Sequence, residues 1–437
     1  MMKKYDKYKD SGVEWIGEIP VDWGVKRGDS FLNLKKNLIK KDDLNGREIY
    51  HYSIPSIQDF GKAIIEDGST VDSDKYEVTG NEILFSKLNP RKGTVVLSLV
   101  HEKLAIASTE FVVLEPIAGS LTFFFYYVTS DGFKSNISSM VESATKSHQR
   151  ANPTDIYKSM FVFPSLTEQT AIANYLDRKT AEIDELIADK KRLLELYEEE
   201  KTSIINQAVT KGINPDVKMK DSGIEWLGEI PEHWEVKRLK HLSSLISKGT
   251  TPSTVGRDVT PSGDVRFIKA ENIVHNQVSS EPENFIDFDT NKILSRSELV
   301  VGDILFVIAG ATLGKIAILK LYLLPANTNQ AISFIRLKDK SSVVFLWYYL
   351  QSITITRIIW LNAVQSAQPN LSMENLGNFY TPLPSQEEQN IIVRHIETEC
   401  TRIDIKKSRT KKLIDLLTEY RTALISEVVT GKIMVVD

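Results

Sequence analysis

Apolar residues recur with a helical period over two long stretches of the chain. From about residue 167 to 209 they fall on alternating steps of three and four residues, and a stretch near the C-terminus repeats the pattern. The seam positions are Leu176, Ile183, Leu186, Leu193, Tyr197 and Ile204 in the first stretch, and Ile396, Ile403, Leu413, Leu417, Tyr420 and Leu424 in the second. The pattern predicts two long helices with coiled-coil seams. The first seam is imperfect, because Lys179, Lys190 and Glu200 occupy its other positions.

Both predicted helices have start signals. Pro164 and Pro384 stand just before them, and residues 165–168 and 385–388 each fit a capping box. A helix of about 43 residues at about 1.5 Å per residue is a rod of roughly 65 Å. Two matching seams in one chain favour pairing with each other. The alternative is two separate helices, each lying on its own domain.

The regions between and before these helices are mixed in character. Short β-rich runs bounded by Gly, Pro and Asn occur beside apolar, aromatic-rich stretches that are typical of helices. The β-rich runs include residues 94–99, 111–114, 304–308 and 332–335, and the helical stretches are 121–128 and 343–350. Each region spans about 140 residues, which is enough for its own core. We therefore predict a mixed α/β fold of two α+β domains joined by two long helices.

The chain also repeats itself. The segment KDSGVEWIGEIPVDWGVKR at residues 9–27 returns as KDSGIEWLGEIPEHWEVKR at 220–238, with 14 of 19 positions identical. The helix openings repeat at a second offset, and the order is motif, variable region, helix, then the same again. The predicted domains are a motif with a first variable domain (1–163), a central helix (164–213), a motif with a second variable domain (214–383) and a C-terminal helix (384–437).

Composition narrows the class of protein. The 437 residues are 42% hydrophobic and 26% charged, an ordinary globular balance. We find no apolar run of about 18 residues and no apolar stretch near the start that would suit a signal peptide. Cys400 is the only cysteine, which excludes internal disulfides and a cysteine-built zinc site. We expect a cytoplasmic protein. The net charge of −4 does not by itself indicate a nucleic-acid binder.

These repeated segments resemble the specificity subunits of type I restriction–modification systems. The element SG-x-EW-x-GEIP-x-x-W-x-VKR, at residues 11–27 and 222–238, resembles the start of each half of such subunits. The PS-x-x-EQ opening of each long helix resembles their conserved spacer regions. Gly-Asp-Ile-Leu-Phe at 302–306 and the segment Asn327–Gln330 resemble features of their target recognition domains. The resemblance covers nearly the whole chain.

The resemblance implies a function and a set of partners. Each of two target recognition domains would read one half of a split sequence in double-stranded DNA, while an antiparallel pair of long helices holds them at a fixed separation. Two methyltransferase subunits would dock on this scaffold, and restriction subunits could join. S-adenosylmethionine, ATP and Mg²⁺ are expected on those partners, with no cofactor and no catalysis on this chain. Because the two variable regions differ, we expect different half-sites and an asymmetric target.

Candidate DNA contacts follow from the residue types that such contacts need. Bases are read by Arg, Lys, Asn or Gln on loops, and phosphates are bound by Lys, Arg, Ser or backbone N–H groups. The second domain offers a polar loop that matches the Gly-Thr-Pro loop of the family, a glycine-rich loop and two polar stretches. Its candidates are Lys248, Thr250, Thr251, Ser253, Thr312, Lys315, Asn327, Asn329, Gln330, Gln365 and Gln368. Ordinary surface loops, a glycine-shaped strand connection and turn-forming asparagines remain the alternatives.

The first domain offers two segments. Residues 86–93 place three cations around a proline, which favours phosphate binding, and KSHQR at 146–150 corresponds to the polar stretch at 365–368. The candidates are Lys87, Asn89, Arg91, Lys92, Lys146, His148, Gln149 and Arg150. This domain has no equivalent Gly-Thr-Thr-Pro loop, so contacts cannot be transferred between the halves.

The tryptophans of the repeated motif have two interpretations. Trp15, Trp23, Trp226 and Trp234 recur in pairs, and aromatic side chains of this kind could face a partner subunit. We favour the other interpretation, in which they anchor the packing of the chain.

Enzyme signatures are missing. The adenine-methyltransferase signature of Asn or Asp, two prolines and an aromatic residue fails, because residues 152–153 and 214–215 contain one proline each. Residues 310–315 are not a phosphate-binding P-loop, because the spacing is short and Ile316 replaces Ser or Thr. The histidines form no pair at metal-ligand spacing.

One pattern resembles a nuclease signature. Pro215-Asp216, followed by Glu235-Val236-Lys237, fits the loose PD…E-x-K pattern of metal-dependent nucleases. Glu235 lies inside the repeated element, and its equivalent in the first copy is Gly24, which favours an accidental match. A nuclease and a coiled-coil adaptor that binds only proteins remain the two alternatives to DNA recognition.

Overall fold

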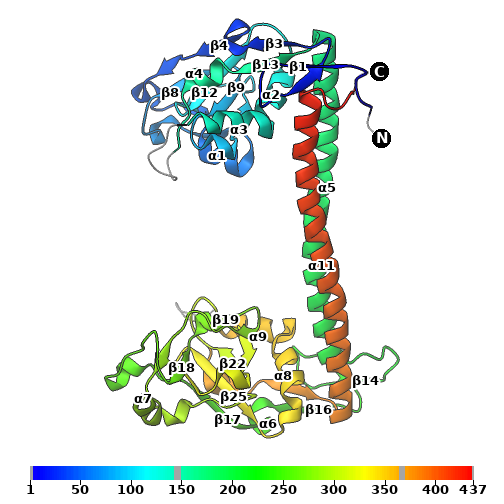
Figure 1. Cartoon of the computed structure of the whole chain (residues 1–437). Coiled ribbons are helices and arrows are strands. Elements are labelled where there is room, and N and C mark those ends of the chain that lie inside the picture. The colour runs from blue at the N-terminus through cyan, green and yellow to red at the C-terminus, as the bar shows by residue number, and fades with distance from the viewer. Residues whose placement is uncertain (1–2, 142–148, 364–369, 436–437) are drawn as a thin grey trace. The chain divides into compact units, whose positions relative to one another are not determined.

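The computed structural model describes residues 3–141, 149–363 and 370–435. The chain forms two compact units, Met1–Lys191 with Lys411–Asp437 and Arg192–Thr410. Each unit contains one mixed domain and part of both long helices, α5 (Leu166–Lys211) and α11 (Gln386–Val429) (Figure 1). The predicted fold class, two α+β domains joined by two long helices, is confirmed. The predicted domain boundaries remain a prediction, since the two compact units divide both helices.

The first unit's domain contains two larger sheets. One is four-stranded in the order β10-β9-β12-β4, and the other is five-stranded in the order β5-β8-β11-β6-β7. Neighbouring strands are antiparallel except for β11 and β6, which are parallel. The strands are β4 (Leu32–Lys35), β5 (Leu38–Ile39), β6 (Glu48–Tyr52), β7 (Ile64–Asp67), β8 (Lys75–Val78), β9 (Ile83–Ser86), β10 (Val95–Leu97), β11 (Ala105–Ser108) and β12 (Phe111–Pro116). The helices are α1 (Ile54–Phe60), α2 (Leu121–Thr129), α3 (Asp131–Ser139) and α4 (Pro153–Tyr157).

The second unit repeats this architecture. Its four-stranded sheet has the order β17-β25-β22-β23, and a three-stranded sheet has the order β21-β18-β24. The strands are β17 (Ser243–Lys248), β18 (Val265–Ile268), β21 (Phe285–Ile286), β22 (Ile304–Val307), β23 (Ile316–Ile318), β24 (Ala326–Thr328) and β25 (Ile332–Leu337), with a separate hairpin of β19 (Ile273–Val274) and β20 (Gln277–Val278). The helices are α6 (Leu239–Leu242), α7 (Phe288–Ile293), α8 (Val343–Leu350), α9 (Ile353–Ala363) and α10 (Met373–Gly377). Strand by strand, β4, β12, β9 and β10 correspond to β17, β25, β22 and β23, so the duplication seen in the sequence is a duplication of fold.

Each repeated motif forms a short hairpin followed by an edge strand. The hairpins are β1 (Tyr8–Asp10) with β2 (Glu18–Pro20), and β14 (Met219–Asp221) with β15 (Glu229–Pro231). The following strands pair with the strand that precedes each long helix: β3 (Gly24–Arg27) with β13 (Met160–Phe163), and β16 (Glu235–Arg238) with β26 (Tyr380–Leu383). The motif therefore ties the start of each half to the start of its helix.

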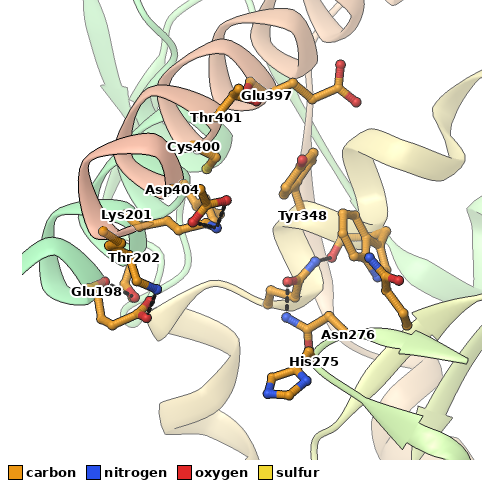
Figure 2. Close-up of a pocket in the computed structure, with 15 residues that line it drawn as sticks. Glu198, Lys201, Thr202, His275, Asn276, Tyr348, Glu397, Cys400, Thr401 and Asp404 are labelled. Atoms are coloured by element: carbon orange, nitrogen blue, oxygen red, sulfur yellow. Dashed lines mark hydrogen bonds and ion pairs between the residues drawn. The ribbon is translucent and has the colours of Figure 1, made fainter. Parts of the chain in front are cut away.

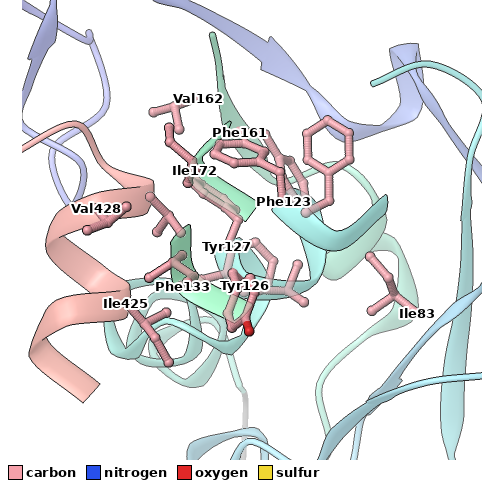
Figure 3. Packing of buried hydrophobic residues seen from close by; sticks show 14 of the residues in the cluster. Ile83, Phe123, Tyr126, Tyr127, Phe133, Phe161, Val162, Ile172, Ile425 and Val428 are labelled. Atoms are coloured by element: carbon pink, nitrogen blue, oxygen red, sulfur yellow. The ribbon is translucent and has the colours of Figure 1, made fainter. Parts of the chain in front are cut away.

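An apolar helix joins each domain to the long helices. In the first unit Phe123 and Tyr127 of α2 are fully buried, with Phe161 of β13, Ile172 of α5 and Val428 of α11 in the same cluster (Figure 3). The hydroxyl of Tyr127 donates to the backbone carbonyl of Met160. In the second unit Tyr349 of α8 makes the same bond to Tyr380. The predicted helical stretches at 121–128 and 343–350 are therefore core helices.

The long helices are antiparallel in both units. An ion pair joins Asp184 to Arg421 at 2.8 Å in the first unit, and another joins Lys201 to Asp404 at 2.9 Å in the second. Later residues of α5 thus pair with earlier residues of α11, as in antiparallel helices. The prediction that the two helices pair with each other is confirmed. The seam prediction is only partly correct. Leu176, Ile183, Ile396, Ile403 and Leu424 are buried, whereas Leu186, Leu413 and Tyr420 are 39–45% exposed.

The second tryptophan of each motif packs beneath the end of a long helix. Trp23 and Trp234 are 1% and 0% exposed. A Cβ at Gly212, just after α5, would lie 3.4 Å from the Trp234 ring, and a Cβ at Gly431, just after α11, would lie 3.0 Å from the Trp23 ring. Both glycines have a positive φ, as helix-terminating residues often do. The packing interpretation is confirmed for this pair.

The first tryptophan of each motif also has intramolecular contacts. The Trp15 ring lies 5.8 Å from that of Tyr127, and the Trp226 ring lies 6.5 Å from that of Tyr380.

Among the described residues, no single helix has the length and apolarity to cross a membrane, although the bent pair Lys340–Leu350 and Ile353–Trp360 meets both criteria together.

Candidate nucleic-acid interface

Three predicted contact segments of the second domain meet at one end of a sheet. In the four-stranded sheet, β17 and β22 end at this end of the sheet, and β23 and β25 begin there. Because the neighbouring strands are antiparallel, the loops 249–251, 308–315 and 329–331 all leave the sheet from the same end. The fold thus gathers segments that lie far apart in the sequence.

The loop after β17 contacts the segment before β25. The Thr250 N–H donates to the Thr328 carbonyl at 3.1 Å, and the Thr251 hydroxyl donates to the Gln330 side-chain carbonyl at 2.6 Å. A Cβ at Gly249 would lie only 2.0 Å from the Thr328 carbonyl oxygen, so this approach requires glycine. Of the predicted residues here, Lys248, Ser253 and Gln330 are exposed, and Thr250, Thr251 and Asn329 are half-buried. They form one polar surface.

The glycine-rich loop between β22 and β23 adjoins the same surface. Gly310 and Gly314 have φ values of 89° and 87°, which shape the turn as the alternative interpretation expected. The Ile308 N–H donates to the Ala331 carbonyl at 2.9 Å, which fixes the loop beside the segment before β25. Lys315 is exposed, and Thr312 is half-buried. A glycine-shaped turn and a DNA-facing position are therefore compatible.

Asn327 is a correction to the predicted set. Its side chain is 0% exposed, and its amide donates to the Asn291 side chain at 2.8 Å and to the Leu294 carbonyl at 3.2 Å. Its side-chain oxygen accepts from the Thr328 N–H. These bonds hold α7 against β24, so Asn327 serves the fold and has no surface to offer DNA.

Gln365 and Gln368 lie outside the described residues. The residues that follow them are described. Asn370 bridges to Ala309, and the Leu371 N–H donates to the Ile308 carbonyl at 2.8 Å. The residues that directly follow these two candidates therefore contact the start of the glycine-rich loop.

The first unit brings its two predicted segments together in the same way. Asn89 and Gly93, with φ of 44° and 60°, shape the loop between β9 and β10. The Asn89 N–H donates to the Gln149 carbonyl at 2.8 Å, and the Leu88–Arg150 bridge matches the Ala309–Asn370 bridge of the second unit. Arg91, Lys92 and Arg150 are exposed, and Lys87, Asn89 and Gln149 are half-buried. Lys146 and His148 lie outside the described residues.

One cation of this surface already has a counter-charge. The Arg150 guanidinium lies 2.6 Å from the Glu110 carboxylate, and the Arg150 side chain is 59% exposed. Glu110 is half-buried, but the Arg150 end of the pair is open to solvent, which screens the attraction between the two charges. Arg150 can therefore leave Glu110 for a phosphate or a base edge.

Sequence reasoning missed the lysines that replace the Gly-Thr-Thr-Pro loop. Val113 of β12 and Phe334 of β25 occupy equivalent positions in the two sheets. Lys35 is paired with Val113 and Ser247 is paired with Phe334, so the next residues, Lys36 and Lys248, are equivalent as well. Lys36, Lys40 and Lys41 are exposed. The signal was present as KKNLIKK at 35–41, but only the strand register places it at the sheet end.

The nuclease-like residues do not form a metal site. The Glu235 carboxylate is paired with Lys237 at 2.7 Å on the exposed side of β16. In the part of the chain that the structure describes, no group of three or more His, Cys, Asp or Glu side chains could hold a metal ion.

Comparison with known proteins gives one family and one fold. A family model described as "Type I restriction modification DNA specificity domain" matches residues 20–196 and 231–415. The putative type I restriction enzyme MjaX specificity subunit of Methanocaldococcus jannaschii is 25% identical over 442 residues, which cover 96% of each chain. The EcoBI specificity subunit of Escherichia coli is 25% identical over 284 residues, 62% of this chain and 58% of its own.

Two solved structures share the fold. The HsdS subunit from Thermoanaerobacter tengcongensis superposes with a TM-score of 0.55 at 16% identity, covering 95% of this chain and 98% of its own. A chain from a structural study of complex assembly and conformational transition of the type I R-M system superposes with a TM-score of 0.69 at 14% identity, covering 94% and 98%.

Proposed function

Because this chain belongs to the type I restriction modification DNA specificity family, whose members recognise DNA rather than catalyse a reaction, we propose that its two sheet-end surfaces read the two halves of a split DNA target. The observation that carries the proposal is the gathering of the predicted contact segments at equivalent sheet ends in both units. A loop that only connects two strands has no need for this shared polar surface.

We assign phosphate and base contacts by side-chain chemistry. Lys248 and Lys315 in the second unit, and Arg91 and Lys92 in the first, are exposed cations suited to phosphates. Gln330 presents an exposed amide, which can pair with a base edge in the major groove. Thr251 orients that amide through its hydrogen bond.

The two surfaces differ, which supports an asymmetric target. After the first strand of the sheet the second unit presents Thr251, whereas the first presents Lys40 and Lys41. Before the next strand of the sheet the second unit presents Gln330, whereas the first presents Glu110, which is paired with Arg150. Different donors and acceptors read different bases.

We further propose the partners that the family resemblance implies. Two methyltransferase subunits dock on the long helices, and restriction subunits join them in the cytoplasm. Exposed apolar residues support such a surface, namely Leu186, Leu196, Leu413, Leu416 and Tyr420. S-adenosylmethionine, ATP and Mg²⁺ belong to these partners.

The phosphate assignment is testable with single lysines. We expect Lys248→Ala and Lys315→Ala, each assembled with the methyltransferase, to weaken binding to every duplex alike. Each should reduce the slope of log K against log salt by about 1, because one phosphate contact is lost. Lys338→Ala is the matched control, since Lys338 is an exposed lysine at the opposite end of β25. Equal salt slopes for all three variants would refute the assignment.

A selection from random duplexes separates recognition from the adaptor alternative. The assembled wild-type protein should enrich one split, asymmetric sequence, and Gln330→Ala should relax only one of its halves. A complex that assembles but enriches no sequence would favour the protein-only adaptor.

A further inference from the structure

The second unit contains a cavity of about 550 Å³ outside the candidate DNA surface. Its walls come from α5, α11, α8 and the β19–β20 hairpin (Figure 2). Tyr348, Glu397 and Cys400 lie together on this lining. No DNA-contact candidate lines the cavity, so its function is a separate question.

The duplicated fold shows what the first unit does with the same positions. Tyr127 and Tyr349 make the same bond to the chain, so the residues before them, Tyr126 and Tyr348, correspond. The Tyr126 hydroxyl donates to Asp177 at 2.7 Å and lies 3.1 Å from the Thr180 hydroxyl. The first unit thus closes this site with its own side chains.

The second unit leaves the equivalent site open. The repeat of the long helices places Glu397 at the position of Asp177 and Cys400 at that of Thr180. Within the described residues, no hydrogen bond joins Tyr348 to either. A thiol is a weak hydrogen-bond partner, so the change from Thr to Cys removes one partner of the closed network.

The charges in the cavity leave one carboxylate without a partner. Lys201 pairs with Asp404 at 2.9 Å, and Lys407 pairs with Glu198. Glu397 lines the same cavity and has no ion pair among the described residues. Burial, with Cys400 and Glu397 nearby, raises the pKa of Tyr348 to about 12, so its hydroxyl stays neutral. The uncompensated charge is therefore negative.

Two aromatic rings and a fixed turn complete the lining. The Trp347 and Tyr348 rings are 4.7 Å apart at 57°, and the buried Trp347 indole N–H has no acceptor. Beside them, in the turn between β19 and β20, His275 and Asn276 both have positive φ, of 50° and 59°, a strained conformation for residues other than glycine. The Asn276 amide is held by Gln351, whose own amide donates to the Trp347 carbonyl at 2.9 Å. These two hydrogen bonds tie the turn to the end of α8.

We propose that this cavity binds an organic cation, an ammonium or guanidinium group held by the Glu397 carboxylate and the faces of Trp347 and Tyr348. Carboxylates and aromatic faces both attract such groups when water is displaced. The cation can come from a free amine or from a lysine or arginine side chain of a protein partner, which offer the same chemistry. The proposal goes beyond DNA reading and does not depend on it.

Argininamide is a suitable probe, because it has a guanidinium group and no carboxylate. We expect it to shift the Trp347 indole N–H resonance of the full chain, identified by its loss in Trp347→Phe. It should also slow alkylation of Cys400, the only thiol of the chain. Glu397→Gln should weaken both effects about tenfold or more, the loss expected for one charge-assisted hydrogen bond. Glu374→Gln, which removes an exposed carboxylate outside the cavity, is the control and should change neither.

The same thiol distinguishes the two sources of the cation. Saturable effects of argininamide that Glu397→Gln removes would support a site open to free cations. If Cys400 is protected from alkylation only when the chain is assembled with the methyltransferase, and if Glu397→Gln removes that protection, the partner supplies the cationic side chain. The proposal is overturned if neither ligand acts, or if Glu397→Gln leaves their effects unchanged.

Discussion

A buried acid shows how the two halves have diverged at single residues. Glu82 and Asp303 stand at matching positions before β9 and β22, and they are 0% and 1% exposed. Burial would raise the pKa of Glu82, but hydrogen bonds from Ser98 and Thr79 and the Lys35 ammonium lower it below its ordinary value. Asp303 receives its cation, Arg336, from a different strand. The acid has been kept while its counter-charge has changed place.

Removing Arg336 should destabilise the second unit. Asp303 accepts two hydrogen bonds from this guanidinium, at 2.9 and 2.8 Å, and its side chain is fully buried. We expect Arg336→Met to lower the free energy of unfolding by about 2–3 kcal/mol, since a buried carboxylate loses its partner. Urea titration measures the change. Lys320→Met, at an exposed lysine, should stay within about 0.5 kcal/mol of wild type. Equal effects would contradict the role given to the pair.

Gly249 allows the close approach of the two loops in the proposed DNA surface of the second unit. We expect Gly249→Ala to cost about 1–3 kcal/mol through overpacking, because its Cβ would overlap the Thr328 carbonyl, and to abolish recognition of one half-site. Gly377→Ala is the control, since its Cβ would meet neighbours at an ordinary 3.5 Å. Unfolding and duplex selection measure the two effects. Normal recognition by Gly249→Ala would show that the loop contact is dispensable.

At the scale of elements, buried and exposed apolar residues lie close together along the long helices. Ile403 is 0% exposed, and Ile405, two residues further along α11, is 49% exposed. We expect Ile403→Ala to cost about 2–4 kcal/mol and Ile405→Ala less than about 1 kcal/mol, because only the first leaves a cavity. Urea unfolding of both variants checks the difference. Similar costs would mean that the helices pack differently from the structure.

Long, strongly patterned elements could be predicted from the sequence, and short or long-range ones could not. The predicted runs at 304–308 and 332–335 are strands β22 and β25, and both long helices begin within their predicted segments. The five-stranded sheet was missed, because β5 has two residues and β11 pairs with β6, whose residues lie some fifty positions earlier. Leu413 was placed in a buried seam because periodicity identifies an apolar face but not what covers it.

For the candidate site, the sequence predicted which segments form loops better than it predicted which residues are exposed on them. Glycines and polar residues marked the loops correctly, since turn chemistry is local. The burial of Asn327 depends on Asn291 and Leu294, which lie more than thirty residues away in the chain, so no local pattern could indicate it. Lys36 needed the strand register of the folded domain.

At the scale of the whole molecule, each long helix begins in one half of the chain and ends against a tryptophan of the other half. α5 starts after β13 of the first unit and ends against Trp234 of the second, and α11 starts after β26 and ends against Trp23. The Met434 N–H then donates to the Lys3 carbonyl at 2.9 Å, so the last described residues pair with the first. Each mixed domain therefore contacts both long helices and its own copy of the motif.

We propose that this chain selects the DNA sequence on which its partners act. The most direct test maps modified bases across the genome of a host that supplies the methyltransferase subunit, with and without this chain. We predict methylation at one split, asymmetric motif that depends on the chain, and the motif should change in one half only when residues 243–337 are replaced by those of a relative. A stable complex with the methyltransferase but no chain-dependent motif would contradict the account.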